Sequence, residues 1–175
     1  MFAPVTPDTL ISTYLHITDR DAFKPTYLHA SNIKIVEMSA ADVAFYRFLY
    51  GEVGREWRWR DRLLLSDVDL YAILSQPGVG VHVLYVDGVP AGYVELANQG
   101  DATEIAYFGL RPNFFGRGLG KYLLSYGIEK ALEDGAKRVW VHTCNLDGPH
   151  ALDNYKKRGF SVYDEHQQPM PNAYQ

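Results

Sequence analysis

The sequence predicts an α/β fold in which helices flank a mostly antiparallel sheet. The first observation is a hairpin, because the alternating apolar segments 81–86 and 90–96 flank Asp87-Gly88, a pair favoured where both turn residues need positive φ. The second is an apolar, β-branched and aromatic segment over 102–110, typical of a strand. The third is an apolar stripe at helical spacing over 119–126, directly after a glycine-rich turn.

The N-terminal part predicts two strands and then two helices. Segments 11–18 and 32–38 have the residue pattern of strands, and residues 1–9 have little pattern. Ser39 is placed to cap a helix over 40–53. The second helix covers 68–74, after Ser66 as its cap and before a Pro-Gly pair.

The C-terminal part predicts alternating helices and strands. Their expected ranges are a helix over 118–133 with Gly135 as C-cap, a strand over 138–144, a helix over 150–158 and a strand over 160–163. From His166 onward the chain contains two prolines, and we expect an irregular tail.

Composition is that of one globular domain over residues 1–175. The hydrophobic fraction of 47% supplies a core, and 22% of the residues are charged. A formal charge of −4 and a pI of about 5.8 argue against a general nucleic-acid binder. The single cysteine, Cys144, allows no intramolecular disulfide, and we find neither a signal peptide nor an apolar run long enough to span a membrane. We therefore expect a cytoplasmic protein that contacts neither nucleic acid nor membrane.

The glycine turn is the strongest motif. Gly116, Gly118 and Gly120 precede the long helix, and glycine permits positive φ and close approach of the backbone to a ligand. The start of a helix carries unpaired N–H groups and partial positive charge, which suit phosphate, and Arg117 and Lys121 add charge. The spacing fits neither a Walker loop nor GxGxxG. The alternative is a tight corner without a ligand.

This turn resembles the cofactor motif of the GNAT acetyltransferases, in which (Gln/Arg)-x-x-Gly-x-(Gly/Ala) holds the pyrophosphate of acetyl-CoA. Gly118-Leu119-Gly120 fits its second half, whereas Phe115 stands where Gln or Arg is usual. A second segment resembles the family's Asn-x-x-Ala-x-x-x-Tyr-x-x-x-Gly-Phe. Its matching residues are Ala151, Tyr155, Gly159 and Phe160. The usual Asn falls on Gly148, so Asn145 or Asp147 could serve instead, or neither.

The resemblance implies an acetyl-CoA-dependent N-acetyltransferase that acts on a primary amine of a small molecule or peptide, by direct transfer in a ternary complex. It implies that two central strands splay apart and that CoA lies between them. Residues 32–163 would form the family core, residues 1–31 an extension or extra strand and residues 164–175 a tail. The N-terminal strand could pair across a homodimer. A regulatory module that binds CoA or acyl-CoA without turnover is the alternative function.

The same resemblance assigns site residues. Those expected to bind the cofactor are Phe108, Leu110, Gly116, Arg117, Gly118, Leu119, Gly120, Lys121 and Asn145. The N–H of Phe108 or Leu110 would polarise the thioester carbonyl, and Gly109 between them would permit close approach.

Transfer to an amine needs a base, since an alkyl amine is mostly protonated near neutral pH. Glu104 and Glu95 are the candidates, each with an exposed strand-edge carboxylate as the alternative. Tyr155 is the expected acid for the leaving thiolate, with a core tyrosine as the alternative. His142 and Cys144 share a strand face, but nothing indicates the third group that a nucleophile pair needs. No histidine spacing indicates a metal.

The acceptor is expected to meet Tyr50, Trp57 and Trp59. Arginines interleave with the tryptophans over 55–62, which favours an acidic or aromatic acceptor through charge and cation–π contacts. The alternative is that the tryptophans belong to the core and the arginines to a solvated rim.

Overall fold

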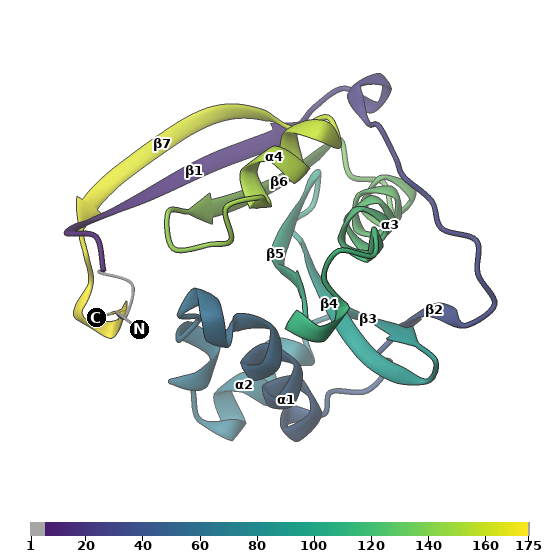
Figure 1. The fold of residues 1–175 in the computed structure, drawn as a ribbon, viewed down its shortest axis with the longest axis horizontal. Helices are drawn as coiled ribbons and strands as arrows, with labels where there is room; N and C mark the ends of the chain where they lie inside the picture. Colours follow the sequence, from purple (N-terminus) through teal and green to yellow (C-terminus); the bar gives the residue numbers. More distant parts are fainter. Residues whose placement is uncertain (1–5, 175) are drawn as a thin grey trace.

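The computed structural model of the chain describes residues 6–174 and contains one seven-stranded sheet (Figure 1). The strand order is β2-β3-β4-β5-β6-β1-β7. The strands are β1 (Thr9–Ile17), β2 (Ile33–Glu37), β3 (Val79–Val86), β4 (Val89–Asn98), β5 (Ala102–Leu110), β6 (Arg138–Cys144) and β7 (Ser161–Pro169). The helices are α1 (Val43–Gly54), α2 (Asp67–Leu74), α3 (Leu119–Glu133) and α4 (Ala151–Lys157), and short 3₁₀ turns include η2 (Arg55–Trp57), η3 (Asp61–Leu63) and η5 (Asn172–Tyr174).

Helices cover both faces of the sheet, so the core has two parts (Figure 1). On one face, Leu123 of α3 and Tyr155 of α4 belong to a cluster that includes Val94 of β4. On the other face, Tyr46 of α1 belongs to a cluster that includes Tyr93 of β4. Because neighbouring residues of a strand point to opposite faces, β4 contributes to both parts.

The central strands part, as the family resemblance implied. β5 and β6 are the only parallel neighbours among the described strands, and they pair only at residues 102–104 and 138–140. Both strands continue beyond this pairing, to Leu110 and Cys144. A register shift in β5 leaves Ala106 unpaired with β4, which is a β-bulge. The wall formed by residues 105–110 of β5 therefore has one edge without a strand partner.

Several local predictions are confirmed and one cap is corrected. Asp87 and Gly88 have φ of 53° and 77°, as the predicted hairpin turn requires. Ser66 caps α2 by accepting a bond from the Asp69 N–H. Ser39 does not cap α1, because the helix begins later and the Asp42 carboxylate accepts from the Phe45 N–H instead.

The two ends of the chain form the far side of the sheet. β1 lies between β6 and β7 and pairs antiparallel with both. Both its edges are used, so this strand has none left for pairing across a dimer, whereas β2 and β7 are the edge strands. The prediction of an irregular tail from His166 is wrong: β7 continues to Pro169 because β1 offers it a partner as far as Thr9.

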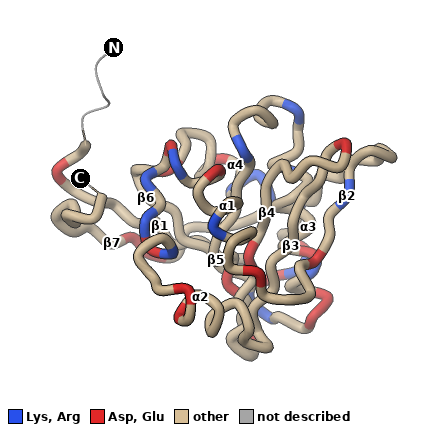
Figure 2. Tube along the Cα trace, turned by 90° about the horizontal axis from the view of Figure 1, so that it is seen from below, with Lys and Arg blue, Asp and Glu red and all other residues tan. Residues whose placement is uncertain are grey.

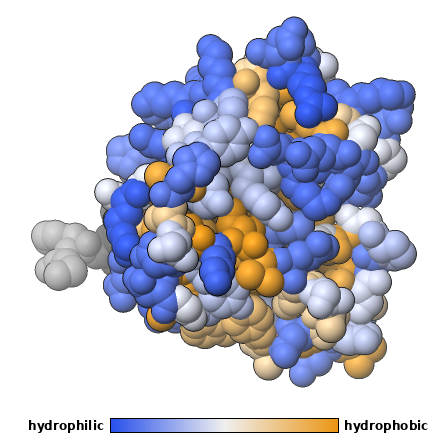
Figure 3. Space-filling view, turned by 90° about the vertical axis from the view of Figure 1, so that its right-hand side faces the viewer, coloured by the Kyte–Doolittle hydropathy of each residue, from blue (hydrophilic) through white to orange (hydrophobic). Residues whose placement is uncertain are grey.

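Basic and acidic residues are interspersed along the chain trace (Figure 2). On the face seen in Figure 3, hydrophilic side chains surround a central hollow in which apolar side chains are visible. Concave apolar surface of this kind is typical of places that bind ligands or partners. Within residues 6–174, no helix has the length and apolar character needed to cross a membrane.

Candidate active site

A cavity of about 1190 Å³ lies where β5 and β6 part. Its walls come from residues 104–110 of β5, the glycine turn, the end of β6 with the following loop, α4, and segment 57–62. Leu10 and Ser12 of β1 and Tyr174 of η5 complete the lining. The cavity therefore joins segments from both ends of the chain.

One end of the cavity is the start of α3. Gly116 and Gly118 have φ of 75° and 74°, a left-handed conformation that favours glycine, and a Cβ on either would meet nothing within 4 Å. α3 is 15 residues long, and the N–H groups of its first turn have no acceptor within the helix. These groups and the lining residue Lys121 can hold an anion.

The predicted cofactor residues in this turn do not all present side chains to the cavity. Leu119 is 1% exposed and packs into the core, so only its backbone is available. Arg117 lies outside the cavity lining, and its guanidinium is 5.7 Å from the centre of the Phe114 ring. Phe115, the departure from the family motif, lines the cavity and is 46% exposed.

The β5 wall offers backbone donors. The Arg111 N–H donates to the Ala91 carbonyl of β4, so by alternation the N–H groups of Phe108 and Leu110 point away from β4, toward the open edge. Gly109 has a different role from the one expected. A Cβ there would lie 2.5 Å from Val53 Cγ1, so this glycine lets α1 pack against β5.

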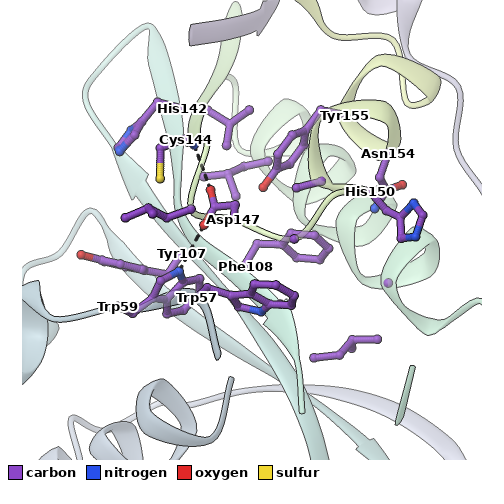
Figure 4. Close-up of a pocket in the computed structure, with 18 of the residues that line it drawn as sticks. Trp57, Trp59, Tyr107, Phe108, His142, Cys144, Asp147, His150, Asn154 and Tyr155 are labelled. Atoms are coloured by element: carbon purple, nitrogen blue, oxygen red, sulfur yellow. Dashed lines mark hydrogen bonds between the residues drawn. The ribbon is translucent and has the colours of Figure 1, made fainter. Parts of the chain in front are cut away.

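Tyr155 projects from α4 into the cavity. Its hydroxyl points inward (Figure 4), and the residue is only 6% exposed. No side chain among residues 6–174 forms a hydrogen bond with this hydroxyl. Burial, and then the charge of Asp147, raises the pKa of Tyr155, so the phenol keeps its proton at neutral pH.

Glu104 lines the cavity with His142. Its side chain is 17% exposed and accepts a bond from Gln99 Nε2 at 3.3 Å. His142 Nδ1 lies 3.7 Å from Glu104 Oε1, and this carboxylate raises the pKa of His142. Burial raises the pKa of the Cys144 thiol to about 11, so the sulfur remains protonated and is a poor nucleophile.

Glu95 does not reach the cavity. Its side chain is fully buried under α1, where it accepts from Arg62 Nη2 at 2.6 Å and from the Tyr46 hydroxyl. The sequence correctly placed Glu95 on the strand face of Tyr93, but this face packs against α1 and α2. Arg62, rather than Glu95, lines the cavity, so Glu95 is not available as a direct base.

The three predicted acceptor residues, Tyr50, Trp57 and Trp59, all line the cavity. Each indole lies over a glycine: a Cβ at Gly148 would be 3.2 Å from the Trp57 ring, and one at Gly54 would be 2.5 Å from Trp59. The rings of Tyr50 and Trp59 contact Tyr107, at centroid distances of 5.1 and 5.2 Å.

Of Asn145 and Asp147, either of which could replace the usual Asn of the family motif, only Asp147 lines the cavity. The Asn145 carboxamide accepts from the Ile11 N–H at 3.0 Å and donates to the Thr9 carbonyl at 2.9 Å, so it fixes β1 and lies outside the cavity lining. Asp147 faces the cavity, where Oδ2 accepts from the Cys144 N–H at 3.0 Å and Oδ1 lies 3.5 Å from Trp59 Nε1 (Figure 4). Oδ2 also accepts from Thr143 Oγ1 at 2.6 Å.

Other lining residues carried weaker signals in the sequence. No role was predicted for the Tyr107 side chain, and Asp61 and Arg62 were expected only as part of segment 55–62, whereas all three line the cavity. The side chains of Asp61 and Arg62 meet the cavity because η3 turns the chain back toward β5. Long-range packing of this kind has no local sequence pattern.

Comparison with known proteins agrees with this geometry. The model of the acetyltransferase (GNAT) family matches residues 43–160. The "Uncharacterized N-acetyltransferase in pepI 3'region" of Lactobacillus delbrueckii subsp. lactis is 32% identical over 155 residues, covering 78% of this chain and 88% of that protein. The mycothiol acetyltransferase of Corynebacterium aurimucosum is 36% identical over 63 residues, 36% of this chain and only 20% of that protein.

A solved structure shares the fold. The GCN5-related N-acetyltransferase of Kribbella flavida superposes with a TM-score of 0.65 at 18% identity, covering 93% of this chain and 58% of that one. The chain thus spans less than two thirds of two of these three proteins. The family match over residues 43–160, together with the parted central strands, shows that the chain belongs to the acetyltransferase (GNAT) family.

Proposed function

We propose that the chain is an acetyl-CoA-dependent N-acetyltransferase that acetylates a primary amine directly, within a ternary complex. The observation that carries the proposal is the open edge of β5 over residues 105–110, which forms a wall of the cavity leading to the start of α3. Bound acetyl-CoA would supply an acetyl group activated as a thioester.

The residues present fit such a ligand. The N–H groups of Gly118, Leu119, Gly120 and Lys121 would hold the diphosphate. The N–H groups of Phe108 and Leu110 would bind the pantetheine arm and the thioester carbonyl, and one such donor typically lowers the barrier by about 3 kcal/mol. The cavity of about 1190 Å³ leaves room for an acceptor as well.

Two side chains would move protons. Glu104 would accept a proton from the attacking amine, because it is the candidate base that lines the cavity. Tyr155 would donate its proton to the leaving sulfur, because its hydroxyl points into the cavity with its proton retained. The raised pKa of Cys144 supports direct transfer over a covalent acetyl-enzyme.

The Tyr155→Phe variant tests the proposed role of the phenol. Turnover, measured as the release of the CoA thiol from acetyl-CoA, is expected to fall by roughly 10²–10⁴-fold, the usual range for a positioned acid. Acetyl-CoA affinity, measured by calorimetry, should stay within about threefold, because the substitution leaves in place the backbone N–H groups proposed to bind the cofactor. Tyr71→Phe, on the exposed face of α2, is the matched control.

Undiminished turnover in Tyr155→Phe would remove this residue from the mechanism. Acetyl-CoA binding by the parent without turnover on any amine of a broad panel would instead favour the CoA-binding regulatory module.

A further inference from the structure

The cavity carries opposite charges at its two ends. Lys121 and the start of α3 make one end positive. Asp61 of η3 and Glu104 of β5 line the other end, and Asp147 stands between. Glu104 is six residues before Leu110, a separation of about 20 Å along a strand. The carboxylates come from three separate segments of the chain, so their meeting in one cavity results from the fold.

The arginines near these carboxylates are already engaged. Arg62 is paired with the buried Glu95 at 2.6 Å. Arg58 donates to the Thr6 hydroxyl and, at 2.8 Å, to the Tyr174 carbonyl. Arg58 keeps its charge, because these two partners are uncharged. With Arg62 paired to Glu95, however, the carboxylates that line this part of the cavity outnumber it: Asp61, Glu104 and Asp147. The acidic acceptor suggested by the arginine-rich sequence 55–62 fits poorly here.

The same end has aromatic walls and unused acceptor capacity. The Asp61 carboxylate accepts from the Tyr174 hydroxyl at 3.0 Å, and one carboxylate can accept about four bonds. The rings of Tyr50, Trp59 and Tyr107 contact one another beside it. The Arg62 guanidinium lies 5.2 Å from the centre of the Tyr107 ring and Tyr50 is 1% exposed, so Trp59 supplies the available aromatic face. Carboxylates beside aromatic faces are the usual surroundings of a bound ammonium group.

A second observation points to a ligand in this cavity. Tyr155 is 6% exposed, and its hydroxyl, which has no side-chain hydrogen bond among residues 6–174, points into the cavity (Figure 4). A hydroxyl aimed into the cavity in this way can donate a hydrogen bond to a bound molecule.

Resting on the proposed function, we infer that the acceptor is a small aliphatic di- or polyamine. Asp61 and the Trp59 ring would hold one ammonium group while another nitrogen, made neutral by losing a proton to Glu104, is acetylated. The nitrogen–carbon bond forms as the thioester carbon–sulfur bond breaks, and the sulfur takes the Tyr155 proton. The proton that the acetylated nitrogen then loses restores the Tyr155 hydroxyl, so the protons balance. The charge at the second nitrogen, rather than the length of the chain, distinguishes this acceptor from a simple alkylamine.

Three probes of similar length test the inference. Putrescine carries a second ammonium, pentylamine carries a methyl group in its place, and γ-aminobutyrate carries a carboxylate. A charged hydrogen bond typically contributes enough to make kcat/KM for putrescine about tenfold or more above that for pentylamine, with γ-aminobutyrate the poorest. Equal or better use of pentylamine or γ-aminobutyrate would overturn the inference.

Three variants locate the effect. Asp61→Asn should lower the putrescine-to-pentylamine ratio by about tenfold, through KM more than kcat. Tyr174→Phe removes the hydroxyl bond to Asp61 but keeps the carboxylate, so it should keep the ratio. Asp101→Asn removes an equal charge from a carboxylate outside the cavity lining, paired with Lys137, and should also keep it. A ratio unchanged in Asp61→Asn, or lowered equally in Asp101→Asn, would contradict the assignment.

Calorimetry with acetyl-CoA separates a failure of the acceptor inference from a failure of the proposed function. If acetyl-CoA binds and pentylamine is preferred, only the acceptor inference fails. If acetyl-CoA does not bind, the proposed function fails. If no probe is acetylated, quenching of tryptophan fluorescence by each probe in the presence of CoA decides the acceptor class. Tighter binding of putrescine supports the inference, and equal, weaker or undetectable binding overturns it.

Discussion

Glu104 and His142 form a pair that should make the free energy of unfolding depend on pH. Glu104 raises the pKa of His142 above its ordinary value of 6.5, so the folded protein binds this proton more tightly than the unfolded chain. The contribution is fully present below about pH 6.5 and is lost as the pH rises through the folded pKa. His142 is 46% exposed, so the change should stay below about 1 kcal/mol.

Urea unfolding of the parent and of His142→Asn between about pH 5 and 9 tests this contribution. The difference between the two proteins should shrink as the pH rises. Asp147 and Asp61 also favour the charged imidazole, whereas burial opposes it, so Glu104→Gln should reduce the effect without abolishing it. His29→Asn, at an exposed loop position, is the control. A difference that is independent of pH would refute the coupling between His142 and Glu104.

At the scale of elements, the contact between Trp57 and Gly148 joins η2 to the loop before α4. A Cβ at position 148 would lie 3.2 Å from the indole, so the Asn usual in the family motif would crowd Trp57. Gly148→Asn should therefore lower the free energy of unfolding by roughly 1–3 kcal/mol, the usual cost of overpacking. The measurement is a double-mutant cycle with Trp57→Ala, in which urea unfolding gives the free energy of unfolding of each of the four proteins.

In the Trp57→Ala background the Asn side chain has space, and its penalty should be smaller. Gly51→Ala gives the opposite control: its added Cβ meets nothing within 4 Å, and replacing a helical glycine should stabilise by roughly 0.5–1 kcal/mol. Additive effects of the Gly148 and Trp57 changes would show that the added side chain does not crowd the indole.

The sequence predicted those elements whose signals are local. The Asp87-Gly88 hairpin, the glycine turn and the Ser66 cap each depend on a few neighbouring residues, and the structure has all three. The end of β7 was missed because all nine of its residues are exposed and lack the alternation of a half-buried strand. Its partner is β1, about 150 residues earlier in the chain.

The candidate site was predictable to the same extent. Tyr155, Glu104 and the glycine turn follow motifs or strand ends, and all line the cavity. Glu95 and Asn145 were misplaced because their environments depend on distant segments. α1 and Arg62 enclose Glu95, and β1 occupies the Asn145 carboxamide.

At the scale of the whole molecule, the sheet consists of two parts joined at a short seam. The seam between β5 and β6 spans residues 102–104 and 138–140. β1 completes the smaller part by pairing with both β6 and β7, and one buried cluster beneath α3 contains Ile105 of β5 and Val139 of β6. The fold thus keeps the open edge of β5 as a stable feature, and the proposed function depends on this edge.

Amide hydrogen exchange with and without acetyl-CoA tests this central claim most directly. The N–H groups of residues 108, 110 and 118–121 should exchange fast in the free protein, because they have no internal acceptor, and should slow by at least about tenfold on binding. Unpaired edge amides of β2 should continue to exchange fast. Saturation with acetyl-CoA that leaves residues 108, 110 and 118–121 as fast as before would contradict the account.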